Sequence, residues 1–173
     1  MFTLAPSVTF WDAGELIASM HNLGIPHPPG TPLFVLLGHA WAALLPVGEY
    51  AWRTNLMSAT FSALAAAGFF LVAHDALQRG TPDMAPAPRR LVTIGGGMAA
   101  GLMAAFTYTQ WQNSNETEVY SIATFTIALI CWICRWAFGP ATWTSRVILS
   151  RSDFDAAIAL TMLAASACQS LPM

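Results

Sequence analysis

The amino-acid sequence predicts an all-α integral membrane protein, on the basis of composition, segment length and arginine placement. Apolar residues make up 55% of the 173 residues and charged residues only 9%, whereas soluble domains carry about 25% charged residues. Several apolar segments reach the roughly 20 residues that a helix needs to cross a bilayer core of about 30 Å. All seven basic residues are arginines. They form no basic run of the kind that nucleic-acid-binding proteins carry, so no nucleic-acid partner is predicted.

The expected membrane spans follow from these apolar segments. Residues 54–76, 91–110 and 119–138 are each long enough to cross. A fourth apolar segment occupies residues 156–173 at the end of the chain. Three to four transmembrane helices are therefore expected in a single membrane domain.

Residues 12–53 precede the first span and are expected to form an outer loop with two surface helices. In the first helix, residues 13–23, the apolar side chains recur at helical spacing on one side, as in an amphipathic surface helix. The second, residues 31–45, is apolar but only about 22 Å long at 1.5 Å per residue. It is therefore expected to lie in the membrane interface. Thr31 is the expected cap of this helix, and Pro32 fits its first turn.

The arginines predict the orientation of the chain in the membrane. Six of the seven lie in the loop 77–90, at the end of the span 119–138, or just beyond it. Such a surplus marks the cytoplasmic side. Residues 1–53 and 111–118 are then expected on the opposite side, provided that residues 31–45 do not cross.

Two loops on the non-cytoplasmic side carry acidic residues that could meet at one cavity. Asp12 and Glu15 lie in the first loop with His27, and Glu116 and Glu118 lie in the second. A carboxylate there can act as a general base towards a hydroxyl group. The structural alternatives remain open: Asp12 and Glu15 could form a helix-capping box, His27 could stabilise its Pro-rich turn, and the later acids could simply be solvated.

Two further motifs are assigned to packing. Gly97 and Gly101 have the spacing of a close-packing face between membrane helices. Cys131 and Cys134 have a redox-like or metal-like spacing, but their apolar setting favours two small side chains on one helix face.

Four blocks of sequence together resemble a family of bacterial multi-span membrane proteins. The blocks are Trp-Asp-x-Gly-Glu from residue 11, His-Pro-Pro-Gly-x-Pro-Leu-Phe from residue 27, Trp-Arg-x-Asn-Leu-x-Ser-Ala from residue 52, and Thr-Glu-Val-Tyr-Ser from residue 117. The family is related to the transmembrane O-mannosyltransferases and belongs with the GT-C glycosyltransferases. The resemblance covers residues 4 to 136.

The resemblance implies a GT-C-like fold and a set of site residues. An opening membrane helix would lead into an outer loop with two surface helices, followed by further spans. Catalytic roles are implied for Asp12, as base or acceptor-positioning group, and for Glu15. Substrate-binding roles are implied for His27, Arg53, Asn55, Glu116, Glu118 and Tyr120.

The implied activity is transfer of a sugar, of mannosyl type, from a polyprenyl-phosphate carrier to an acceptor hydroxyl on a protein or glycan. The carrier-linked sugar and membrane lipid are the expected partners. No metal-ligand set is predicted, although a divalent metal ion could take part. The alternatives are a transporter and a non-catalytic membrane assembly subunit.

The resemblance also bears on the location and extent of the chain. A bacterial inner membrane is the expected location, with the site facing outward. Because the family's opening helix should precede the acid motif, residues 1–11 are expected to be the end of that helix. The span 156–173 is expected to be truncated, so independent activity of this fragment is in doubt.

Overall fold

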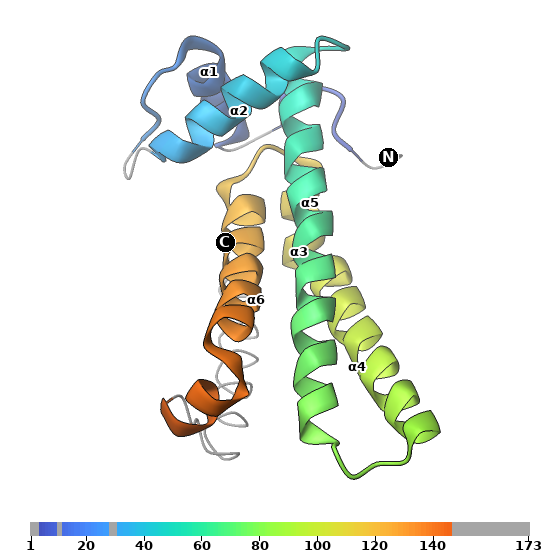
Figure 1. Cartoon of the computed structure of the whole chain (residues 1–173). Helices are drawn as coiled ribbons and strands as arrows, with labels where there is room; N and C mark the ends of the chain where they lie inside the picture. The colour runs from blue at the N-terminus through green and yellow to red at the C-terminus, as the bar shows by residue number, and fades with distance from the viewer. Residues whose placement is uncertain (1–3, 10–11, 28–30, 147–173) are drawn as a thin grey trace, which may run out of the picture. The chain divides into compact units, whose positions relative to one another are not determined.

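The computed structural model describes residues 4–9, 12–27 and 31–146, with side chains as far as residue 135. Within these residues the chain is all-helical and contains no strand (Figure 1). The helices are α1 (Ala13–Asn22), α2 (Pro32–Leu44), α3 (Tyr50–Gly80), α4 (Pro86–Phe106), α5 (Tyr108–Asn115) and α6 (Val119–Arg146). The chain divides into two compact units, residues 1–132 and 133–173. The first unit holds α1 to α5 and the start of α6, and the described part of the second is the rest of α6.

The helices α1 and α2 confirm the two short helices expected from the sequence, and they form a small core with α3. Leu16 and Met20 of α1 pack with Phe34 of α2 and Met57 of α3. Gly38 permits this contact, because a Cβ atom there would collide with the Met20 side chain. Burying each large apolar side chain contributes about 1.5–3 kcal/mol. The two short helices are therefore packed against the N-terminal part of α3.

The start of α2 differs from the expected cap. Thr31 has φ 30° and ψ 56°, a left-handed conformation, and its side chain makes no capping hydrogen bond. The Thr31 hydroxyl is buried without a partner among the described residues. A β-branched residue in this conformation is strained by about 1–3 kcal/mol. Pro32 does occupy the first helical turn, as expected.

The helices α3 and α4 form an antiparallel hairpin, and both extend further towards the turn between them than the sequence predicts (Figure 1). The predicted loop 77–90 shrinks to residues 81–85, because Pro86 and Pro88 lie in the first turn of α4. A missing N–H costs nothing there, since the first-turn N–H groups have no partner within the helix.

The expected close-packing face on α4 is confirmed. A Cβ at Gly97 would lie 3.0 Å from the Phe70 ring, and one at Gly101 would lie 3.1 Å from the Ala66 carbonyl oxygen. These two glycines therefore let α4 approach α3 closely.

The expected span 91–110 is interrupted. Thr107 has an extended conformation, with φ −60° and ψ 133°, and separates α4 from α5. The axes of the two helices are bent by 59°. The predicted loop 111–118 is consequently helical as far as Asn115. The Thr107 backbone N–H and its hydroxyl both donate to the Met103 carbonyl, which satisfies the end of α4.

Among the described residues, only α3 is by itself long and apolar enough to cross a membrane, and α4 with α5 would be a second span if the bent pair counts as one. Three to four spans are therefore not confirmed. The segment 156–173 lies outside the described residues.

The interpretation of residues 1–11 as the end of a helix is wrong for residues 4–9, which are irregular. Pro6 lacks an N–H group. The backbone beside Pro6 forms its hydrogen bond with a distant residue, since the Ala5 N–H donates to the Asn115 carbonyl, 3.1 Å away.

Candidate functional site

A pocket of about 290 Å³ lies where the beginning of α1, the turn before α2 and the beginning of α6 meet. The residues that line it are Asp12, Leu16, Pro26, His27, Thr31, Glu118, Val119 and Tyr120. Asp12 and Glu118 belong to the two acidic loops that the sequence placed on one side of the membrane. The structure thus brings them to one cavity.

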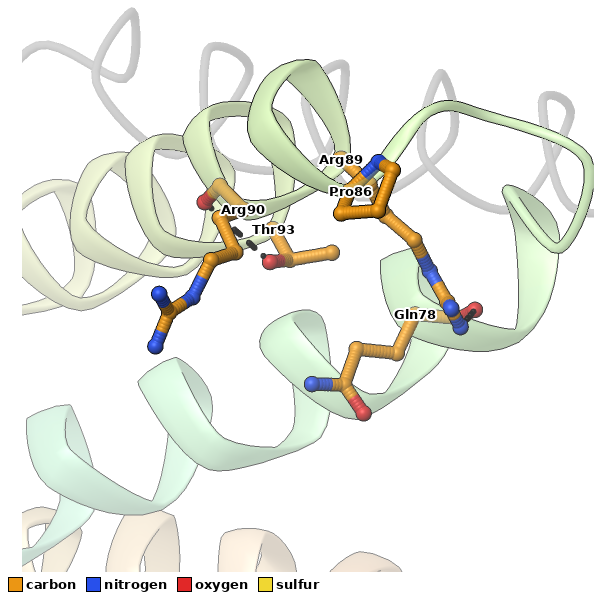
Figure 2. Close-up of a pocket in the computed structure, with 5 residues that line it drawn as sticks. All are labelled: Gln78, Pro86, Arg89, Arg90 and Thr93. Carbon is orange, nitrogen blue, oxygen red and sulfur yellow. Dashed lines mark hydrogen bonds between the residues drawn. The ribbon is translucent and has the colours of Figure 1, made fainter.

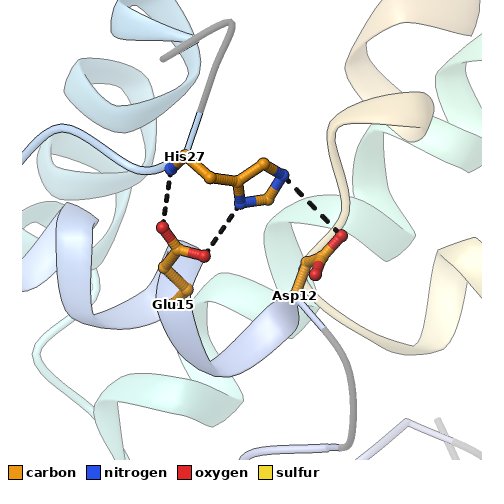
Figure 3. A network of polar contacts seen from close by, with 3 residues as sticks. All are labelled: Asp12, Glu15 and His27. Carbon is orange, nitrogen blue, oxygen red and sulfur yellow. Dashed lines mark hydrogen bonds and ion pairs between the residues drawn. The ribbon is translucent and has the colours of Figure 1, made fainter.

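Glu15 holds His27 at the edge of this pocket (Figure 3). One Glu15 carboxylate oxygen accepts the His27 backbone N–H at 2.6 Å, and the other lies 2.8 Å from His27 Nδ1. Both Glu15 oxygens are therefore occupied. The geometry favours a positioning role for Glu15 over the catalytic role that the resemblance implied.

Asp12, in contrast, has its carboxylate available. Its side chain is 61% exposed, and its nearest charged partner is His27, with 3.9 Å between Asp12 Oδ2 and His27 Nε2. The structural alternative of a capping box is wrong. Asp12 has helical dihedral angles and makes no side-chain cap bond, whereas an effective N-cap residue takes an extended conformation.

Charge and burial shift the pKa values of three groups around the pocket. The hydrogen bond that the Glu15 carboxylate accepts from the His27 ring raises the pKa of His27 above 6.5, and the same contact lowers the pKa of Glu15 below 4.5. Burial raises the pKa of Glu118 above 4.5, with smaller contributions from the carboxylates of Glu116 and Asp12. The pocket therefore combines a hydrogen-bonded pair, in which each partner favours the charged form of the other, with a carboxyl group whose burial disfavours ionisation.

A row of buried polar side chains on α3 positions the second acidic loop. Ser58 accepts the Glu118 backbone N–H at 3.3 Å, and Ser62 donates to Ser121 at 3.0 Å. Thr54, Asn55, Ser58 and Ser62 are all nearly or fully buried. Sequence reasoning did not identify this row, although its spacing of about four residues along an apolar helix is a recognisable signal of helix contact.

Asn55 does not line the pocket. Its side chain is fully buried, and its amide nitrogen donates to the carbonyls of Ala5 and Ser7 at 3.0 and 3.3 Å. The Thr117 hydroxyl donates to the Asn55 Oδ1 atom at 2.6 Å. Asn55 thus joins three distant parts of the chain, which favours a structural role over the implied substrate contact.

The Arg53 side chain is hydrogen-bonded to the end of α2 and to the turn between α2 and α3. Its guanidinium donates to the Ala42 carbonyl at 2.9 Å and to the Gly48 carbonyl at 3.1 Å. The Ala42 carbonyl is one of the acceptors left unpaired at the end of α2. The guanidinium group also lies over the Tyr50 ring. The implied binding of a lipid phosphate by Arg53 would require this turn to rearrange.

The remaining two predicted site residues, Tyr120 and Glu116, line different pockets. Tyr120 is exposed and lines the pocket with Asp12. Glu116 instead lines a neighbouring hollow of about 270 Å³ beside Ala5 and Thr9. In the described part of the chain, no three His, Cys, Asp or Glu side chains are grouped as a metal site.

The fold and the site together define a helical protein with a membrane-length helix and an acidic pocket beside its N-terminal end. The family model described as "Protein O-mannosyl-transferase TMEM260 N-terminal domain" matches residues 12–166, and the chain belongs to that family.

Two curated relatives carry the same description. Protein O-mannosyl-transferase TMEM260 of Mus musculus is 34% identical over 132 residues, which cover 74% of this chain and 16% of the relative. Its namesake from Dictyostelium discoideum is 28% identical over 171 residues, which cover 92% and 19%. The chain thus spans less than a fifth of either relative. No solved structure matches it.

Proposed function

We propose that this chain forms the acidic acceptor site of a membrane glycosyltransferase that moves a mannosyl-type sugar from a polyprenyl-phosphate carrier to a hydroxyl group. The names of the two relatives support the transferase class, and α3 supports a membrane location. The proposal includes a GT-C-like architecture and an outward-facing site. The Lys-free composition favours the inner membrane of a bacterium.

The observation that carries the proposal is the availability of the Asp12 carboxylate. Asp12 neither caps α1 nor makes a hydrogen bond to His27, yet it lines a pocket formed by two distant acidic loops. A carboxylate at a pocket wall whose one recorded ion pair is as long as 3.9 Å can accept a proton from a bound hydroxyl group.

The reaction then proceeds in one displacement. The acceptor oxygen attacks the anomeric carbon of the sugar, and Asp12 takes the hydroxyl proton. The bond between that carbon and the phosphate oxygen breaks, and the polyprenyl phosphate leaves with the bonding electrons. Attack opposite the leaving group inverts the anomeric carbon.

The other pocket residues orient these groups. His27 is fixed by Glu15, and its raised pKa favours the protonated ring, which would contribute positive charge towards the phosphate of the donor. Tyr120 offers a hydroxyl and an exposed ring to the sugar, since aromatic faces bind apolar faces of ligands well. Glu118 offers a second carboxyl group to the same pocket.

A transporter would be expected to carry ionisable groups inside its spans. Residues 54–73 of α3 contain none, and neither do residues 91–106 of α4. His74 and Asp75 lie only at the far end of α3, and the other ionisable groups of α3 and α4 lie near the helix ends. The transferase is therefore favoured over the transporter.

The test is Asp12→Asn in the complete protein, assayed in membranes with labelled polyprenyl-phosphate mannose and an acceptor. Loss of a general base costs about 10²–10⁴-fold in rate. The fold should be preserved, because the Asp12 side chain makes no capping bond. Equal amounts of membrane-inserted protein should therefore show transfer reduced by that factor.

Asp83→Asn is the matched control, since Asp83 is an exposed acid in the turn between α3 and α4. It should transfer sugar at the parental rate. If Asp12→Asn also keeps a rate within a few-fold of the parent, Asp12 is not the base and the proposal fails.

A further inference from the structure

A second pocket, of about 190 Å³, lies at the end of the hairpin formed by α3 and α4 (Figure 2). Gln78 of α3 forms one wall, and Pro86, Arg89, Arg90 and Thr93 of α4 form the other. Two arginines thus line a hollow that contains no acidic side chain. None of these residues belongs to the acidic pocket.

The donors of this pocket are incompletely paired within the described chain. Arg89 Nη2 donates to the Gln78 carbonyl at 2.6 Å, but the buried Arg89 Nε has no acceptor. Arg90 is exposed, and its guanidinium makes no hydrogen bond or ion pair that the structure records. A buried donor without an acceptor is destabilising, so an anionic oxygen at this position would be stabilising.

The volume and lining restrict the ligand. A site of this size is smaller than the roughly 300–1,000 Å³ of pockets for drug-sized ligands, but it can hold a tetrahedral oxyanion. Arginine guanidinium groups match phosphate geometry with two parallel donors. The ligand chemistry is therefore a phosphate or phosphodiester group.

The position along α3 indicates where that phosphate comes from. The second acidic loop is held by Thr54 and Ser58, and Gln78 lies 24 and 20 residues beyond them. At 1.5 Å per residue the separation along α3 from Thr54 is about 36 Å, slightly more than a bilayer core of about 30 Å. The basic pocket then lies at the level of the opposite headgroup layer. Basic pockets between membrane helices on that side bind anionic headgroups.

We propose that the pocket between Gln78, Arg89 and Arg90 binds the phosphate of an anionic membrane lipid at the end of the hairpin opposite the acidic site. The bound lipid would fix the turn between α3 and α4 at the membrane surface. This role does not depend on sugar transfer.

The test measures binding of phosphatidylglycerol to the full chain by native mass spectrometry from mixed micelles with phosphatidylcholine. Thermal unfolding in the same micelles gives a second readout. Arg90→Gln should weaken phosphatidylglycerol binding by about fivefold, the factor expected for one arginine at a membrane surface. Arg90→Lys should retain part of the binding. Because Arg90 is exposed, both variants should fold.

Arg79→Gln is the matched control. Arg79 lies at the same end of α3 but pairs with Asp75 at 3.1 Å and does not line the pocket. Its variant should bind phosphatidylglycerol as the parent does. Equal losses for Arg79→Gln and Arg90→Gln would show a diffuse surface charge effect and overturn the proposal. If inorganic phosphate alone raises the unfolding temperature as much as phosphatidylglycerol does, the pocket is a free-anion site and the lipid assignment is overturned.

Discussion

At the residue scale, the pocket's chemistry depends on which carboxylates are already hydrogen-bonded. Glu15 uses both oxygens on His27, whereas Asp12 has only a long contact to the same ring. Two acids three residues apart therefore have different roles. Sequence spacing alone could not separate them, because Asp12 and Glu15 also fit a capping box. The deciding partner, His27, is 12 residues further on.

The pair of Glu15 and His27 predicts a pH window for the local structure. His27 has a raised pKa, so its stabilising contribution is complete below pH 6.5 and is lost as the pH rises through the higher folded value. Glu15 has a lowered pKa, so its contribution is complete above pH 4.5 and is lost as the pH falls through the lower folded value. Both contributions are complete between pH 4.5 and 6.5.

NMR titration of the histidine rings checks this prediction. Glu15→Gln should move the pKa of His27 down towards its ordinary value, because the charged acceptor is lost. Glu49→Gln, an exposed acid that does not contact His27, is the control and should leave the titration unchanged. An unaltered His27 pKa in Glu15→Gln would show that the pair does not form in solution.

Asn55 carries a separate prediction about stability. Asn55→Leu keeps similar volume but leaves the carbonyls of Ala5 and Ser7 without their donor. It should destabilise the fold by about 1–3 kcal/mol, seen as a lower unfolding temperature. Gln112→Leu, at an exposed position, should change stability by no more than about 0.5 kcal/mol. Equal unfolding temperatures for the two variants would contradict the buried role of Asn55.

At the scale of elements, local patterns predicted the short helices better than the long ones. The apolar spacing of 13–23 and the length and proline boundaries of 31–45 are local signals, and α1 and α2 lie where they predict. The loop 77–90 is predicted too long, because Pro86 and Pro88, which are unfavourable inside a helix, are tolerated in the first turn of α4. The break at Thr107 has no proline or glycine to mark it.

The hairpin of α3 and α4 predicts a sharp difference between two glycines of α4. Gly101→Leu should destabilise the hairpin by about 1–3 kcal/mol, since overpacking against a backbone carbonyl cannot be relieved by a side-chain rotation. Gly95→Leu should be tolerated, because a Cβ at Gly95 has no neighbour within 4 Å. Thermal unfolding of both variants in detergent measures the difference. Comparable destabilisation by the two substitutions would contradict the packing of Gly101 against Ala66.

At the scale of the whole molecule, the sequence predicted that two acidic loops meet but not what holds them together. Asp12 and Glu118 do line one pocket. The contacts that position Glu118 join residues about 60 positions apart, as in Ser58 to Glu118 and Ser62 to Ser121. Such pairings depend on the crossing of helices and leave only a weak mark in the sequence. The irregular segment 4–9 was misassigned for the same reason, since its partners, Asn55 and Asn115, are distant.

The proposed orientation in the membrane gives the last prediction. If α3 crosses once, α5 and the turn 81–85 lie on opposite sides. In a background with the native cysteines replaced, a membrane-impermeant thiol reagent added outside should modify Gln112→Cys. It should modify Asp83→Cys only after the membrane is permeabilised.

Both positions are exposed, so a difference in labelling reports the side of the membrane and not burial. Moving the arginines that flank the turn, Arg79 and Arg89, across the core is costly, which keeps the turn on one side of the membrane even when Asp83 is replaced. Labelling of Asp83→Cys from outside, with Gln112→Cys protected, would invert the orientation and place the acidic pocket in the cytoplasm. Equal labelling of both would show that α3 does not cross.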